Sequence, residues 1–223
     1  MLAVAILAAS ITPAGAGGKT AVAVALVLAL DSSASVDQRE FQLQVAGLAS
    51  AFADPDVLRE IETLKPLGAA VAVVQWGGPG ESRIVLPFTL IADGRDAKAF
   101  GFRASLMRRW ILASSTSIAD AIDDSRMALD AADYEGFRRV IDVSGDGTDN
   151  GGGDLDGARA RAEAAGITVN GLPIMADDVA LGDYYRGHVI TGAAAFSQPA
   201  RDFEDYARAI KEKLLRELRP VES

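Results

Sequence analysis

The chain has 223 residues, enough for one α/β domain, and 49% of them are hydrophobic, which excludes a mainly disordered protein. A net charge of −9 argues against nucleic-acid binding, which needs a basic face, and against adhesion to anionic membrane surfaces. The absence of cysteine excludes disulfides, thiolate metal sites and cysteine nucleophiles, and a single histidine, His188, excludes histidine-rich metal sites.

The N-terminal segment has the pattern of a secretory signal. Residues Met1–Ile11 are apolar, and Ala14-Gly15-Ala16 is a small-residue sequence of the kind that precedes cleavage. We therefore expect a signal peptide over residues 1–18, cleaved after Ala16. The domain over residues 19–219 is then expected to be exported, to the periplasm or outside the cell.

Two features of this segment qualify the interpretation. No Lys or Arg precedes Lys19, so a start further upstream, a retained anchor and a buried N-terminal helix stay open as alternatives. Pro13 and the short apolar length argue against a membrane span, which needs about 20 apolar residues. We expect no membrane insertion of the mature domain.

Beyond this segment, apolar runs alternate with helical patterns. Phe41, Val45 and Leu48 fall at i, i+4 and i+7, as on one face of a helix, whereas the runs that end near Leu30 and Trp76 are continuously apolar, as in buried strands. In chain order, strands are expected at 21–30, 69–76, 83–90, 138–143 and 167–174, with a short one at 189–190; helices are expected at 41–52, 57–64, 97–110, 118–129, 154–165 and 203–218.

The run over 83–90 differs from the other strands because it contains Pro87. Proline cannot donate to a central ladder, so this strand belongs at an edge. The short glycine-rich link at Gly77-Gly78-Pro79-Gly80 predicts an antiparallel hairpin with the strand before it. The predicted fold is therefore α/β: a doubly wound, mostly parallel sheet with one antiparallel edge strand, flanked by helices as in Rossmann-like folds.

Oxygen-bearing side chains collect on three loops of this sheet. Asp31, Ser33 and Ser35 follow the first strand, Asp146 follows the strand over 138–143, and Thr116 stands in a polar loop before a helix. Loops after successive parallel strands gather at one edge of the sheet, where ligands bind. Two carboxylates and three hydroxyls are hard donors that suit Mg²⁺, which takes six oxygens and usually keeps several waters. The sequence therefore predicts a metal site at these five residues.

The order and spacing of these elements resemble the von Willebrand factor A domain family over about residues 19–218. Asp31-x-Ser33-x-Ser35 is similar to the Asp-x-Ser-x-Ser element of the family's metal-ion-dependent adhesion site, Thr116 to its threonine, and Asp146-Gly147 to its Asp-Gly after the fourth strand. The loop reads Ser-Gly-Asp-Gly where the family often has Thr-Asp-Gly. The chain looks closest to an uncharacterised bacterial subgroup of A-like domains in exported proteins (DUF1194-like).

The resemblance implies a divalent cation, normally Mg²⁺ with Mn²⁺ or Ca²⁺ as alternatives, that binds a carboxylate of a protein partner or surface ligand. The resemblance does not imply that the protein is an enzyme. The chemistry is consistent with that expectation. A cation that is held mainly by hydroxyls and waters keeps much of its charge, so it can accept an Asp or Glu from a partner.

Each site residue also has a structural interpretation. Ser35 with Gln38 matches a Ser-x-x-Gln capping box, and serines before helices are often only caps. Ser115 and Ser117 have the same chemistry as Thr116 and could take its place. Asp146 before a glycine could be a turn residue.

Other polar residues are assigned structural roles. Asp142 lies within a strand, where a carboxylate must be partnered or partly exposed, so we expect a structural role for it. Gly145-x-Gly147 lacks the third glycine of a dinucleotide fingerprint, because Asn150 stands there. A hydrolase triad that uses His188 has no Gly-x-Ser-x-Gly nucleophile elbow to support it.

Three hypotheses for function remain after the sequence is considered. The first is a binding module that uses Mg²⁺ to engage an acidic group. The second is a metal-assisted hydrolase, because a cation with an open position could activate water, although no separate general base stands out. The third is a structural domain with a vestigial site.

Overall fold

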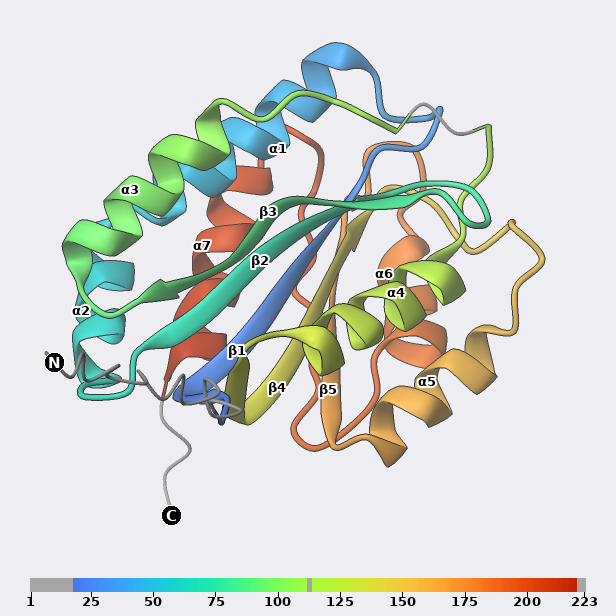
Figure 1. Cartoon of the computed structure of the whole chain (residues 1–223). Helices are drawn as coiled ribbons and strands as arrows, with labels where there is room; N and C mark the ends of the chain where they lie inside the picture. Colours follow the sequence, from blue (N-terminus) through green and yellow to red (C-terminus); the bar gives the residue numbers. More distant parts are fainter. Residues whose placement is uncertain (1–17, 112–113, 220–223) are drawn as a thin grey trace, which may run out of the picture.

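The computed structural model describes residues 18–111 and 114–219, so residues 1–17, nearly all of the expected signal peptide, lie outside the described part of the chain. Its centre is a five-stranded sheet in the order β3-β2-β1-β4-β5 (Figure 1). All neighbouring strands are parallel except β3, which runs antiparallel to β2, so the predicted fold class is confirmed. The strands are β1 Thr20–Asp31, β2 Ala69–Trp76, β3 Ser82–Ile91, β4 Tyr134–Gly145 and β5 Ile167–Pro173.

The first strand is apolar from Ala21 to Leu30 because both of its faces are buried over most of this length. Leu26 and Leu28 pack into one core, and Val27 and Ala29 pack into the other. Helices cover the two faces (Figure 1): α1 Gln38–Ala51, α2 Pro55–Thr63, α3 Gly94–Ser105 and α7 Tyr206–Leu218 on the first, and α4 Ile118–Ala131, α5 Leu155–Ala164, α6 Leu181–Tyr184 and the π-helical turn η1 Tyr185–Val189 on the second. Within the described residues, no helix combines the length and the apolar character that crossing a bilayer requires.

The edge strand β3 accommodates Pro87 at an irregularity of its ladder. Val71 of β2 pairs with Thr89, but Val73 pairs with Leu86, so the register slips between these pairs. Pro87 therefore falls where β3 has an extra residue and the ladder needs no donor from it. The hairpin and the edge position predicted for this strand are confirmed.

The helix expected over 97–110 is wrong in its last turn, because α3 ends at Ser105. The buried side chain of Gln75 explains the change. Its Nε2 donates to the carbonyl of Arg108 at 2.8 Å, and its Oε1 accepts from the amide of Trp110 at 2.8 Å. These two bonds hold the segment beside the end of β2. In a helix, the carbonyl of Arg108 and the amide of Trp110 would not both face the side chain of Gln75.

Two local predictions are also corrected by the structure. The strand expected at 189–190 is wrong, because Val189 ends the turn η1 and only the next residues reach the sheet, where Thr191 forms a bridge with Val169. The capping box of α1 is formed by Asp37 and Glu40. Asp37 accepts from the amide of Glu40 at 2.8 Å, and Glu40 accepts from the amide of Asp37 at 2.7 Å. Ser35 is thus not the cap of this helix.

A buried carboxylate fixes the start of α7 and gives a test of the fold. Asp205 has a side chain only 4% exposed, and it accepts from Arg208 at 2.6 and 2.8 Å and from the Arg201 amide at 3.0 Å. The hydrogen bonds from Arg208, against the opposing effect of burial, hold the pKa of Asp205 well below its usual range. The carboxylate therefore stabilises the fold in its ionised form.

We expect Asp205→Asn to lower the free energy of unfolding at neutral pH by about 2 kcal/mol, because the charge-assisted bonds to Arg208 are lost. Because the folded-state pKa lies below the unfolded value, the contribution is full above about pH 4 and declines as the pH falls towards the folded value. Urea unfolding of both proteins at neutral pH and near pH 3 measures this, with the smaller difference expected at low pH. An equal difference at both would contradict the assignment.

Candidate metal centre

The structure places all five predicted ligand residues at the carboxyl edge of the sheet. Asp31 is the last residue of β1, Ser33 and Ser35 lie on the loop that follows it, and Asp146 comes directly after β4. Thr116 lies just before α4. β1 and β4 are adjacent parallel strands, so their carboxyl ends meet, as the loop argument required.

Four of the five residues form one chain of polar contacts. The amide of Ser33 donates to Asp31 Oδ1 at 2.7 Å, and the hydroxyls of Ser33 and Ser35 lie 3.1 Å apart. The Ser35 hydroxyl donates to Asp146 Oδ1 at 2.8 Å and so joins the β1 loop to the β4 loop. Asp31 and Ser33 are buried, whereas Ser35 is exposed, so the chain runs from the interior to the surface.

Thr116 lies beside this chain without a hydrogen bond to it among the described residues. The Cβ that Gly147 lacks would lie 3.7 Å from Thr116 Oγ1, which puts the hydroxyl next to the Asp146 loop. The backbone is held by two residues: the Thr116 amide donates to Asn150 Oδ1 at 2.8 Å, and its carbonyl accepts from Gly151 at 2.8 Å. The three predicted loops are therefore brought together.

The site concentrates negative charge. Burial, followed by the nearby Asp146 charge, raises the pKa of Asp31 to about 7, although hydrogen bonds from Ser33 oppose the rise. Burial also raises the pKa of Asp146, with the charge of Asp177 contributing. Among the described residues, no Lys, Arg or His forms an ion pair with either Asp31 or Asp146. A bound cation would supply the missing positive charge and favour both carboxylates in their ionised form.

A polar atom without a partner tests whether these residues suit a cation. Asp31 Oδ2 is buried and has no hydrogen-bond partner in the described part of the chain, a costly arrangement for a carboxylate. No group of three or more His, Cys, Asp or Glu side chains among the described residues is arranged to hold a metal. A site with two carboxylates and three hydroxyls is of a different kind, and its all-oxygen donors fit Mg²⁺, Mn²⁺ or Ca²⁺.

Arg109 is a supporting residue that the sequence interpretation missed. Its guanidinium donates to the carbonyl of Ser33 at 2.6 Å and to that of Ser32 at 3.1 Å, and so fixes the backbone of the first loop. Gln75 holds the segment that carries Arg109. No signal in the sequence revealed this role. Residues 97–110 have a helical pattern, which placed Arg109 on a helix and not in a segment beside the first loop.

Asp149 is a second supporting residue that was missed. Its Oδ1 accepts from the amides of Ile118 at 2.6 Å and Ala119 at 3.3 Å, so it caps α4 from another loop. Because Thr116 lies just before α4, this cap ties its position to the β4 loop. An Asp-Asn pair after Asp146-Gly147 was a visible signal, since both types favour backbone contacts in loops.

Gly145 lets the buried carboxylate fit. A Cβ at this position would lie 2.8 Å from the Tyr185 hydroxyl and 2.9 Å from Asp31 Oδ2, closer than real Cβ contacts. Both neighbours are fully buried and have little room to move. Only a residue without a side chain therefore leaves Asp31 in its place.

We expect Gly145→Ala to lower the free energy of unfolding by about 1–3 kcal/mol through overpacking, and to weaken divalent-cation binding by displacing Asp31. Chemical unfolding and a Mn²⁺ titration of the variant measure the two effects. Gly80→Ala is not a suitable control because Gly80 has a positive φ of 70°, whereas Gly187 has open space around it and serves that purpose. Normal Mn²⁺ binding by Gly145→Ala would contradict the packing argument.

Three solved structures share this fold, at sequence identities that speak for the fold alone. Proximal thread matrix protein 1 from the mussel byssus matches with a TM-score of 0.64 and 14% identity over 89% of this chain, which spans 49% of that protein. A von Willebrand factor type A protein from Catenulispora acidiphila matches with a TM-score of 0.59 and 19% identity over 87% of this chain, which spans 42% of that protein. The vWF domain of the pilus tip protein Mfa5 from Porphyromonas gingivalis matches with a TM-score of 0.59 and 11% identity over 91% of this chain, which spans 98% of that domain.

The descriptions of these proteins bear on the candidate site. The byssus protein has also been solved with a zinc-occupied metal-ion-dependent adhesion site, with a TM-score of 0.62 to this chain. None of the three is described as an enzyme. The von Willebrand factor A-like fold expected from the sequence is thus confirmed.

A sequence relative of another kind matches a shorter part of the chain. Over 108 residues, 48% of this chain, it is 32% identical to the aliphatic sulfonates import ATP-binding protein SsuB 2 of Pseudomonas aeruginosa (strain UCBPP-PA14), and it covers only 35% of that protein. A nucleotide-binding P-loop follows a strand and opens a helix. Here Gly18-Lys19-Thr20 leads directly into β1, and Pro13 stands where the motif has its first glycine. That segment therefore has neither the sequence nor the setting of a P-loop.

A family model covers nearly the whole of the described domain. It is described as "Protein of unknown function (DUF1194)" and matches residues 21–222. The match includes β1 through α7 and therefore all three loops of the candidate centre. The chain belongs to the DUF1194 family, and its domain has the von Willebrand factor A-like fold.

Proposed function

We propose that this protein is a metal-dependent protein-binding module. Asp31, Ser33, Ser35, Thr116 and Asp146 would hold one divalent cation, Mg²⁺ in the first place and Mn²⁺ or Ca²⁺ as alternatives. The cation would supply a positively charged position that accepts a carboxylate from a partner. The protein's own residues orient the hydroxyls and leave the exposed side of the site, at Ser35, open to that partner.

The observation that carries the proposal is Asp31 Oδ2, which is buried and has no hydrogen-bond partner in residues 18–111 and 114–219. It lies at the inner end of a hydrogen-bonded chain that reaches Asp146 through two serine hydroxyls. A helix cap would use the serine hydroxyls on backbone amides. Instead, the cap of α1 is Asp37, and this leaves the hydroxyls of Ser33 and Ser35 directed to each other and to Asp146.

The partner is proposed to be a protein or surface ligand that presents an Asp or Glu side chain. A chain with a net charge of −9 repels an acidic partner overall, so a bound cation would supply a local position that attracts its carboxylate. Export to the periplasm or beyond the cell is proposed from the signal-like residues 1–18. A pilus tip protein among the fold neighbours is consistent with that location.

Partner capture from the native source tests the proposal. The full chain is immobilised and exposed to an extract in Mg²⁺, in EDTA, and as the Asp31→Ala variant. We expect partners that bind in Mg²⁺ and are absent in both other arms. Asp156→Asn is a matched control, because this carboxylate lies at the start of α5 and its side chain is 87% exposed. The same proteins captured in all arms would refute a metal-dependent module.

A further inference from the structure

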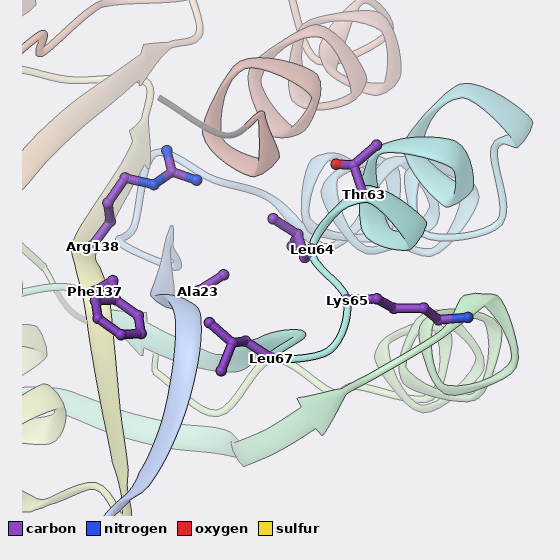
Figure 2. Close-up of a pocket in the computed structure, with 7 residues that line it drawn as sticks. All are labelled: Ala23, Thr63, Leu64, Lys65, Leu67, Phe137 and Arg138. Carbon is purple, nitrogen blue, oxygen red and sulfur yellow. The ribbon is translucent and has the colours of Figure 1, made fainter. Parts of the chain in front are cut away.

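A second feature lies at the opposite edge of the sheet from the candidate centre. Two adjoining hollows open near the start of β4, with volumes of about 340 and 490 Å³. Phe137 and Arg138 line both of them. Figure 2 shows the smaller hollow, with Leu64 and Leu67 across from these two residues. Their combined size is in the range of sites that hold small organic molecules.

Arg138, in the shared wall, forms no ion pair with any residue that the structure describes. It is half-buried, and its Nη2 is inaccessible to solvent and has no hydrogen-bond partner among the described residues. Burial lowers the pKa of its guanidinium. Figure 2 shows the side chain leaving β4 on one side of the smaller hollow. A buried guanidinium nitrogen without an acceptor is costly unless a ligand supplies one.

Arg216 adds positive charge to the larger hollow. Its guanidinium stacks 3.5 Å from the centre of the Phe196 ring, and it makes no ion pair among the described residues. The other two arginines in this lining are already paired, Arg139 with Asp130 and Arg219 with Glu60. Two arginines are therefore left for a ligand in a protein whose net charge is −9.

One carboxylate, that of Glu217, also lines the larger hollow; its Oε1 is engaged elsewhere, and its Oε2 is buried without a hydrogen-bond partner among the described residues. Glu217 Oε1 accepts from Lys213 at 2.7 Å and from Asn170 at 2.9 Å. The charge of Glu217 acts to raise the pKa of Arg138, but the lowering by burial is larger. The two groups are not within ion-pair distance. Repulsion from this carboxylate grows with the negative charge of a ligand, so it opposes a dianion such as phosphate more strongly than a ligand with a single negative charge.

The rest of the lining is suited to an apolar body. Phe137 is 76% exposed and offers an apolar ring, and Phe196, Val140 and Ala193 contribute further apolar surface. Planar guanidinium groups bind carboxylates in a fixed geometry. We propose that these hollows form a binding site for a small organic monocarboxylate, with its carboxylate on Arg138 and its apolar body against Phe137 and Phe196.

Calorimetric titration of the full chain tests this site with 3-phenylpropionate as the probe. All titrations contain EDTA, so that a carboxylate cannot bind through a metal at Asp31. We expect saturable binding of 3-phenylpropionate, much weaker binding of acetate, and none of 3-phenylpropanol, which has the same body without the charge. Arg138→Met should weaken binding by about 10-fold or more, whereas Arg95→Met, a change at an arginine that is 89% exposed, should leave it unaltered.

A second measurement does not depend on how the variants fold. In the unmodified chain, the probe should shift the backbone amide resonances of residues 137–140, 168–170 and 193–196, and leave those of 31–35 unchanged. No saturable binding, equal binding of the alcohol, or shifts confined to other residues would each overturn the proposal. Residues 220–223 follow α7 directly, so a chain that ends at Arg219 is also titrated. Binding that appears only after this truncation would show that the chain's own end occupies the hollow, which also overturns the proposal.

Discussion

The Asp31→Asn variant is expected to lose the stabilisation that Mg²⁺ gives to the unmodified protein. A ligand at about 100 times its dissociation constant stabilises the folded state by about 2.7 kcal/mol. Removing a charged ligand should weaken cation affinity by about 100-fold or more, because even the residues that support ligands cost 10- to 100-fold. Thermal unfolding with Mg²⁺ and with EDTA measures the effect.

The same variant should behave differently without metal. The raised pKa of Asp31, about 7, means that ionising this carboxyl group destabilises the metal-free fold; the cost begins above the unfolded pKa of about 4 and is full above about pH 7. In EDTA at about pH 8, the amide should therefore be at least as stable as the carboxylate. A variant that unfolds earlier in EDTA, by the same amount as in Mg²⁺, would show that Asp31 has a structural role and not a metal-binding one. Asp156→Asn should match the parent in both buffers.

Replacing Lys213 with methionine is expected to be the most destabilising single change outside the metal centre. Lys213 is fully buried on α7, where it donates to Glu217 at 2.7 Å and lies 3.2 Å from Asp142 Oδ1. Both carboxylates are also buried, and burial raises the pKa of Asp142 to about 8 even though the Lys213 charge opposes the rise. Without Lys213, two buried acids face each other with no cation between them. Breaking such a pair costs about 3–5 kcal/mol.

Urea unfolding of Lys213→Met against Lys211→Met measures this cost. Lys211 lies on the same helix and pairs with Asp54 and Asp56 at the surface, with a side chain 32% exposed. Its loss should cost about 1 kcal/mol or less. Similar losses for the two variants would refute the buried network. The network also accounts for Asp142, which the sequence indicated to be structural because a strand carboxylate needs a partner.

The sheet could be predicted from the sequence because of where its strands lie. β1 and β2 are buried on both faces, so their apolar runs are continuous and unmistakable, and Pro87 marked the edge. The end of α3 could not be predicted, because the signal for it is on another strand. The residues over 106–110 fit a helical pattern, and contacts with distant residues, among them those between Gln75 and their backbone, hold them out of a helix.

The candidate site shows the same division. Its five oxygen-bearing residues could be found because each stands at the end of a strand or the start of a helix, and parallel topology brings such positions together. Arg109 could not be found, because it acts on the loop through backbone carbonyls across 76 residues of sequence and leaves no local pattern. Asp149 is an intermediate case. Its polar loop could be predicted from the sequence, but the helix that it caps, α4, could not.

Titration of the purified full chain with Mg²⁺ and Mn²⁺ measures whether the three loops bind a cation. The chain is first treated with EDTA and dialysed, then studied by calorimetry beside Asp31→Asn and Asp156→Asn. We expect one saturable site per chain in the parent and in Asp156→Asn, and none in Asp31→Asn. Absence of saturable binding in the unmodified chain, or undiminished binding by Asp31→Asn, would contradict a cation site at these three loops.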